Sequence, residues 1–181
     1  ALCARAVGPK NVLTLSMPSR QVASTDLARG WADQLGIGYQ LAFLDELYIK
    51  TQETFDPFVN ASPKASQKGF DALRQDAQAN QLARLRMIAL YTAAQTHGYL
   101  VAGTSNKSEL LIGYYTKWGD GASDVAPIGD LYKTQVRELA GQLGVPKTIM
   151  KAPPSAELFV GQTDEEDLGV TYRTLDLVLH G

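Results

Sequence analysis

Short apolar runs alternate with longer helical patterns along this chain, and that alternation limits the fold more than any other feature. Strands are predicted over residues 12–17, 37–43 and 99–103. Helices are predicted over residues 1–7, 26–35, 45–55 and 76–97, and an irregular loop over 56–69. Because alternating strands and helices imply parallel strands joined by right-handed crossovers, we expect an α/β fold with a parallel sheet.

Composition narrows the classes of function. The 181 residues suit one domain, and 17 Lys and Arg against 19 Asp and Glu give a net charge of −2. No global field therefore favours nucleic acid or an anionic membrane surface, and no apolar run approaches the roughly 18 residues of a membrane span. The single Cys3 excludes an internal disulfide, and no zinc-site spacing is present. These features favour a cytoplasmic protein that binds any phosphate locally.

The segment 103–109, after the third predicted strand, is the first candidate site. In open parallel sheets ligands bind beyond the carboxyl ends of the strands. Thr104 offers a hydroxyl there, the amides that open the next helix attract anions, and Glu109 offers the hard oxygen that Mg²⁺ prefers. Asn106 and Glu109 also have the spacing of a capping box. Spacing alone favours the cap over the metal ligand.

Two further segments carry candidate chemistry. The Gly- and Asp-rich loop 113–124 contains Lys117, Asp120 and Asp124, which are either functional or simply solvated loop charges. Its Gly119-x-Gly121 lacks the strand–turn–helix frame of a dinucleotide fingerprint, which disfavours a dehydrogenase. A later helix is predicted with Asp130 as its cap, and Lys133 near its positive end could hold a phosphate.

The acidic run that follows Thr163 is predicted to be a helix start. Thr163 and Glu166 have capping-box spacing. Carboxylates in the first turn complement the helix dipole.

Several short motifs occur in one consistent order, and together they resemble the NAD synthetase family across nearly the whole chain. They are MPSR (17–20), NxxxRxR (80–86), GTSNKSE (103–109), TKWGD (116–120), PIGDLYKT (127–134) and PPSAEL (153–158). The resemblance implies a doubly wound, Rossmann-like parallel sheet with helices on both faces, of the adenine nucleotide alpha hydrolase-like type.

The resemblance also implies a carbon–nitrogen ligase of NAD biosynthesis. The nicotinate carboxylate of deamido-NAD attacks the α-phosphate of ATP, and pyrophosphate leaves an adenylated intermediate. Ammonia then displaces AMP, which yields NAD. Mg²⁺ and lysines are expected to neutralise the departing pyrophosphate.

Site residues follow from the matching motifs. For ATP, the resemblance implies contacts from Arg20, Thr104, Lys133 and Ser155, with Arg20 bordering the adenine pocket and Ser155 in a mobile loop where the family commonly has Thr. Glu109 matches the family's Mg²⁺ ligand.

For deamido-NAD, the resemblance implies contacts from other motifs. Arg84 resembles the arginine that binds deamido-NAD, and Lys117, Asp120 and Asp124 resemble the loop around its nicotinate end. Lys117 and Asp120 are the expected catalytic residues.

Two motifs of the family are absent from residues 1–181. The sequence has neither the family's Ser-Gly-Gly-x-Asp-Ser phosphate loop nor its C-terminal His-Lys pair. We therefore expect residues 1–181 to be one synthetase domain trimmed at both ends, lacking the first strand and inactive alone.

The resemblance further suggests a homodimer, and it leaves open a glutaminase domain as the ammonia source. Two alternatives remain: another ligase of the ATP-pyrophosphatase superfamily, or a nucleotide-binding fragment without turnover.

Overall fold

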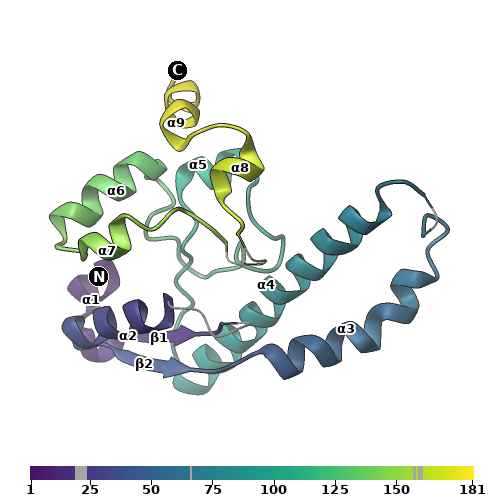
Figure 1. The fold of residues 1–181 in the computed structure, drawn as a ribbon. Helices are drawn as coiled ribbons and strands as arrows, with labels where there is room; N and C mark the ends of the chain where they lie inside the picture. The colour runs from purple at the N-terminus through teal and green to yellow at the C-terminus, as the bar shows by residue number, and fades with distance from the viewer. Residues whose placement is uncertain (19–23, 66, 157, 159–160) are drawn as a thin grey trace.

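A computed structural model describes residues 1–18, 24–65, 67–156, 158 and 161–181 (Figure 1). The strands are β1 (Leu13–Ser16) and β2 (Gly38–Leu41). The helices of the N-terminal half are α1 (Leu2–Val7), α2 (Ser24–Leu35), α3 (Asp45–Asn60) and α4 (Phe70–His97). The remaining helices are α5 (Lys107–Ile112), α6 (Lys133–Gln142), α7 (Lys147–Met150), α8 (Asp164–Leu168) and α9 (Tyr172–His180).

The parallel sheet predicted from the sequence is present. β1 and β2 pair in parallel, with Leu13 opposite Gly38 and Ser16 opposite Leu41. Helix α2 makes the crossover between them, as parallel neighbours require. Both strands are shorter than predicted. The described residues therefore have an α/β fold with a parallel sheet and many helices.

The strand predicted over residues 99–103 is wrong as a ladder strand. Among the residues that the structure describes, this segment forms one isolated parallel bridge, between Ala102 and Val125. The Val101 amide donates to the Asp124 carboxylate at 2.8 Å, and the Gly103 amide donates to the Val125 carbonyl at 2.8 Å. These hydrogen bonds join the segment to the loop residues Asp124 and Val125, which take the place of a neighbouring strand.

Helices α3 and α4 form a long hairpin that projects from the rest of the molecule (Figure 1). Helix α3 continues through Pro57 to Asn60, and α4 begins at Phe70, so the irregular loop predicted over 56–69 is shorter than expected. An ion pair of 2.7 Å between Arg74 and Asp56 and a hydrogen bond from the Tyr48 hydroxyl to the Gln78 carbonyl join the two helices. These cross-links stabilise the extra helical turns.

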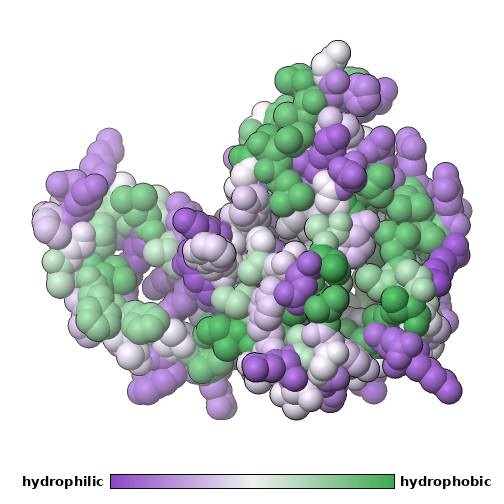
Figure 2. Space-filling view, turned by 180° about the vertical axis from the view of Figure 1, so that it is seen from behind, coloured by the Kyte–Doolittle hydropathy of each residue, from purple (hydrophilic) through white to green (hydrophobic). Residues whose placement is uncertain are grey.

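The buried apolar residues come from several elements, and α4 contributes more of them than any other described helix. The buried apolar residues include Ala79, Leu82, Ala83 and Ala94 of α4, and Ala32, Leu44, Val101, Tyr132 and Tyr172 from other elements. Apolar side chains also gather on the surface over the hairpin and over α9 (Figure 2). Within the described residues, no helix is both long and apolar enough to cross a membrane.

Candidate functional site

The start of α5 fixes the carboxylate of Glu109. The Asn106 side chain accepts a hydrogen bond from the Glu109 amide at 3.1 Å, and Glu109 Oε2 accepts one from the Asn106 amide at 2.9 Å. This reciprocal arrangement confirms the predicted capping box. Because only Oε2 serves the cap, Glu109 Oε1 is directed to other partners.

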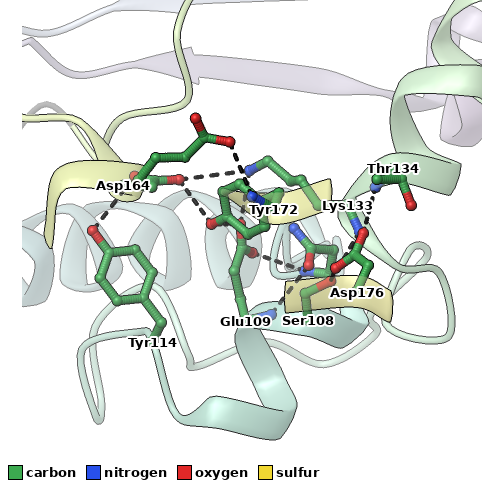
Figure 3. Close-up of polar contacts among 10 residues, drawn as sticks. Ser108, Glu109, Tyr114, Lys133, Thr134, Asp164, Tyr172 and Asp176 are labelled. Carbon is green, nitrogen blue, oxygen red and sulfur yellow. Dashed lines mark hydrogen bonds and ion pairs between the residues drawn. The ribbon is translucent and has the colours of Figure 1, made fainter. Parts of the chain in front are cut away.

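Lys133 lies at the start of α6 and meets Glu109 directly. Its Nζ is 2.8 Å from Glu109 Oε1 and 3.7 Å from Asp164 Oδ2 (Figure 3). The Lys133 and Glu109 side chains are 21% and 13% exposed and that of Asp164 is 6% exposed, so water screens these charges only weakly. The sequence-predicted phosphate and metal residues are thus brought together.

Tyr172 completes this group, which we call the acid–lysine centre (Glu109, Lys133, Asp164 and Tyr172). Its hydroxyl lies 2.9 Å from Asp164 Oδ2 and 3.3 Å from Glu109 Oε1, and the Lys133 Nζ lies 4.8 Å from its ring centroid. Burial, followed by the negative charges of Glu109 and Asp164, raises the pKa of Tyr172 above its ordinary value. The phenol therefore stays protonated and donates to the carboxylates.

Tyr114 flanks the centre on the α8 side. Its hydroxyl lies 2.8 Å from Asp167 Oδ2 and 3.5 Å from Asp164 Oδ1. Burial, with hydrogen bonding to Asp167, raises the pKa of Tyr114 as well. Tyr114 links the start of α8 to the residues that follow α5.

Asp176 of α9 holds the start of α6, and the predicted Asp130 cap is wrong. The N-cap position is Tyr132, and the Asp176 carboxylate accepts from the Thr134 amide at 2.8 Å and from the Ser108 hydroxyl. The Ser108 oxygen in turn accepts from the Lys133 amide at 3.0 Å. A buried side chain from a distant helix supplies the cap because α9 packs against both α5 and α6.

The loop 113–124 is held against α4. The Arg84 guanidinium donates to the Lys117 carbonyl at 3.2 Å, and the Thr116 hydroxyl contacts the Asn80 side chain at 2.6 Å. Asp120 accepts from the Thr116 amide at 3.0 Å. The structure therefore brings predicted Arg84 together with the loop that carries Lys117 and Asp120.

Within this loop, the Asp124 side chain forms hydrogen bonds to two other segments of the chain. Its carboxylate accepts from the Val101 amide at 2.8 Å and from the Tyr91 hydroxyl at 3.4 Å. Its side chain thus anchors the loop to segment 99–103, a role that differs from that of a solvated loop charge.

The tip of the loop has a constrained backbone. Trp118 has a φ of 61°, a left-handed conformation that is uncommon for a non-glycine residue, and the residue is 67% exposed. Next to it, a Cβ added to Gly119 would lie 2.8 Å from Thr116 Cγ2 and 3.1 Å from the Ala83 methyl group. Close approach of the loop to α4 therefore requires glycine at position 119.

The other predicted ATP residues are placed less completely. Thr104 is exposed just before the cap of α5. Ser155 is half-buried in the segment 153–156. The Asp164 amide donates to the Pro154 carbonyl at 2.9 Å, and Arg86 donates to the Ala156 carbonyl at 3.5 Å. Arg20 lies outside the described residues.

A cavity of about 590 Å³ lies between β1, β2 and α4. It is lined mainly by apolar side chains and reaches the carboxyl ends of both strands, and its lining includes Leu15, Met17, Leu41, Leu85 and Ile88. Such apolar concavities are the usual form of small-molecule sites.

The donor set of the acid–lysine centre fits a magnesium ion only in part. The described residues hold no group of three or more His, Cys, Asp or Glu side chains able to enclose a metal. Mg²⁺ is commonly held by one or two carboxylates together with substrate phosphates. Glu109 Oε1 accepts from Lys133 and Tyr172, so an ion bound there would take the place of one of these contacts and share its ligands with a polyphosphate.

Sequence reasoning missed Asp164, Tyr172 and Asp176. It interpreted the acidic run after Thr163 as a helix start, and α8 does begin there, with the Thr163 hydroxyl accepting from the Glu166 amide. Asp164 nevertheless points inward with a total exposure of 4%. For Asp164 the local signal was an acidic residue at the first position of a helix, which is common.

Comparison with known proteins agrees with the motif order. The family model described as NAD synthase matches residues 1–180. The NH(3)-dependent NAD(+) synthetase of Pyrococcus horikoshii is 45% identical over 179 residues, which are 98% of this chain and 64% of that protein. The chain thus spans about 64% of the length of that relative.

Solved structures show the same likeness. The structure of NMN synthetase from Francisella tularensis matches with a TM-score of 0.80 and 36% identity, over 93% of this chain and 65% of the other. The NH3-dependent NAD synthetase from Campylobacter jejuni matches with a TM-score of 0.65 and 34% identity, over 83% of this chain and 59% of the other. With a family model that matches almost every residue, the chain belongs to the NAD synthase family.

Proposed function

We propose that this chain carries out the ATP-dependent amidation of deamido-NAD to NAD, with ammonia as nitrogen donor. The observation that carries the proposal is the 2.8 Å contact between Lys133 and Glu109, where α5 and α6 begin. This contact places a cation and a hard anionic ligand side by side, as polyphosphate binding with a divalent ion requires. Family membership and the name of the Pyrococcus relative supply the reaction.

On the ATP side, Lys133 contacts the phosphates as a point charge, and Thr104 and Ser155 add hydroxyl contacts. Glu109 holds Mg²⁺, which when bound supplies positive charge to stabilise the departing pyrophosphate. The apolar cavity at the ends of β1 and β2 takes the base. Arg20, which the motif match assigns to the adenine pocket, lies outside the described residues. Residues 1–181 belong to a single domain of the doubly wound, Rossmann-like type, whose parallel pair is β1–β2.

On the deamido-NAD side, Arg84 binds the dinucleotide and the loop that includes Lys117, Asp120 and Asp124 surrounds the nicotinate end. Lys117 and Asp120 position the reacting carboxylate. One carboxylate oxygen attacks the α-phosphorus of ATP while the bond to pyrophosphate breaks. Ammonia then adds to the activated carbonyl, loses a proton, and expels AMP. Exclusion of water protects the adenylate from hydrolysis.

Assembly and location complete the proposal. Exposed apolar side chains on the hairpin, such as Phe58 at 74% and Leu73 at 60% exposure, support a homodimer through this region. The single cysteine supports a cytoplasmic setting. The similarity to the NH(3)-dependent enzyme of Pyrococcus horikoshii supports free ammonia as the nitrogen source.

A second candidate substrate is the mononucleotide acid that corresponds to NMN. The Francisella structure, with a TM-score of 0.80, is of an NMN synthetase. NMN is the mononucleotide counterpart of NAD, and the same two-step amidation produces either one. The two candidates differ only in the presence of the second nucleotide.

The test is an assay of the complete gene product that contains this chain. With ATP, Mg²⁺ and ammonium, we expect NAD to form from deamido-NAD with stoichiometric AMP and pyrophosphate. A higher kcat/KM for nicotinate mononucleotide would establish the second candidate instead. Binding of ATP by calorimetry with no amide product from either acid would contradict both candidates and leave a nucleotide-binding protein.

Variants of the 113–124 loop should separate the two substrate sites. Lys117→Ala and Asp120→Asn should raise KM for deamido-NAD about tenfold, which corresponds to about 1.4 kcal/mol of binding, while KM for ATP changes less than about twofold. Asn keeps the acceptor that Thr116 needs, so Asp120→Asn removes charge without releasing the loop. Initial rates over a grid of both substrates measure the effect.

Lys10→Ala is the matched control, because Lys10 is exposed in the turn before β1 and lies outside the loop. It should leave both KM values unchanged. Equal losses for ATP and deamido-NAD in the loop variants would show general loss of loop structure and contradict the assignment.

A further inference from the structure

The corner between α8 and α9 delivers two buried polar side chains to the acid–lysine centre. Asp164 is 4% exposed and Tyr172 is fully buried. Both contact the Lys133–Glu109 pair: Asp164 Oδ2 lies 3.7 Å from Lys133 Nζ, and the Tyr172 hydroxyl lies 3.3 Å from Glu109 Oε1 (Figure 3). The hydrogen bond of 2.9 Å between Tyr172 and Asp164 makes the two side chains one unit.

The formal charges of the acid–lysine centre indicate that Asp164 and Tyr172 do more than fill space. The centre holds two carboxylates and one ammonium, so it carries a net charge of −1 before any ligand binds. An isolated buried carboxylate is costly. Asp164 is retained beside the cation, and within the described part of the chain its further side-chain donors are the phenol hydroxyls of Tyr172 and Tyr114. When Glu109 shares its charge with a divalent ion, Asp164 is the anion that still attracts the Lys133 ammonium.

The tyrosine ring restricts the same ammonium from another side. Lys133 Nζ lies 4.8 Å from the Tyr172 ring centroid, within cation–π range. A lysine side chain has many rotamers, so contacts with one carboxylate alone would leave it mobile once a polyphosphate competes for it. Two carboxylates and a ring face define one position.

Asp164 also connects the centre to the predicted phosphate-covering segment. Its backbone amide donates to the Pro154 carbonyl at 2.9 Å, next to Ser155. The residue that contacts Lys133 with its side chain therefore also attaches the segment that carries Ser155.

We propose that Asp164 and Tyr172 are positioning residues, which hold the Lys133 ammonium in place beside Glu109 for the reacting polyphosphate. This inference rests on the proposed function for its kinetic consequence. Neither residue touches substrate in the proposal; each acts through Lys133 and Glu109. A misplacement of about 1 Å can cost about 100-fold in rate, and outer-shell partners of site residues typically matter 10- to 100-fold.

The variants are Asp164→Asn and Tyr172→Phe in the complete gene product, with Asp167→Asn as matched control. Asp167 lies on the same short helix and contacts Tyr114 and Gln162. We expect kcat to fall about 30-fold in Asp164→Asn and about tenfold in Tyr172→Phe. KM for ATP should stay within about threefold, since removing a negative charge near the site does not weaken anion binding. The double variant should be no worse than Asp164→Asn alone, because the pair acts as a unit.

A second readout does not depend on turnover. With ¹⁵N-labelled lysine, the ammonium protons of Lys133 should give a correlation signal, because a held ammonium exchanges its protons slowly with water. A Lys133→Arg variant assigns that signal. The signal should persist in Asp167→Asn and disappear in Asp164→Asn and Tyr172→Phe. The backbone amide spectrum of each variant should remain that of a folded protein.

Each outcome decides the proposal. A Lys133 signal that persists in both variants, or a kcat equal to that of Asp167→Asn, overturns it. Loss of the backbone spectrum in both variants also overturns it, because the pair would then simply maintain the fold. If the wild type forms no amide product but its Lys133 signal depends on both residues, the proposed function fails and the positioning role stands.

Discussion

Replacing Glu109 with Gln should lower turnover about 100-fold, which corresponds to about 2.7 kcal/mol of transition-state stabilisation. Gln retains a side-chain oxygen that can accept from the Asn106 amide, so the capping box of α5 is kept. The substitution removes the charge that a divalent ion needs and the ion pair to Lys133. The apparent Mg²⁺ requirement should also rise, which a magnesium titration of initial rates measures.

The matched control is Glu166→Gln, which makes the same chemical change at the same position of another helix start. Glu166 is exposed in the first turn of α8, next to its cap Thr163. Its variant should keep wild-type turnover at every magnesium concentration. If Glu109→Gln follows the same titration curve as Glu166→Gln, the capping role alone accounts for Glu109, and the metal assignment is wrong.

The largest effect on stability is expected from Asp176→Ala. This carboxylate accepts from the Ser108 hydroxyl and the Thr134 amide in a buried setting. Each hydrogen bond to a charged group contributes about 1.5–3 kcal/mol, so the free energy of unfolding should fall by about 3–5 kcal/mol. Thermal unfolding should then shift downward by roughly 10 °C in a chain of this size.

Asp130→Ala is the corresponding control, because the sequence predicts Asp130 as the cap of the same helix. Asp130 is exposed, and its removal should change the free energy of unfolding by less than about 0.5 kcal/mol. Denaturant titrations of both variants compare the two candidate caps directly. Equal losses would show that Asp176 contributes no more than a surface residue to the start of α6.

The features that the sequence predicted well are those set by neighbouring residues. The Asn106–Glu109 box and the Thr163 cap depend on a spacing of three residues, and both are present. The two paired strands follow from short apolar runs, and the crossover helix between them follows from its period. The positions of Glu109 and Lys133 at helix starts also came from local pattern.

What the sequence could not predict depends on contacts between distant segments. Asp176 lies 42 positions after Thr134, and its role appears only when α9 packs against α6. Asp164 and Tyr172 approach Lys133 through the corner between α8 and α9, which no periodicity encodes. The segment 99–103 has the composition of a strand, yet its partner is the loop carrying Asp124, and only the tertiary arrangement determines that pairing.

The two halves of helix α4 have different surroundings: one half forms the projecting hairpin with α3, and the other packs against the rest of the protein (Figure 1). Helix α4 is 28 residues long, about 42 Å at the usual rise per residue. Its buried side chains begin at Ala79, whereas the turns before that residue have only α3 as a described cross-linked neighbour. Backbone amides at the distal end therefore open by local fraying and those from Ala79 onward by cooperative unfolding. Asn80 and Arg84 come after Ala79 and hold the 113–124 loop. Local opening at the hairpin tip therefore leaves these contacts intact.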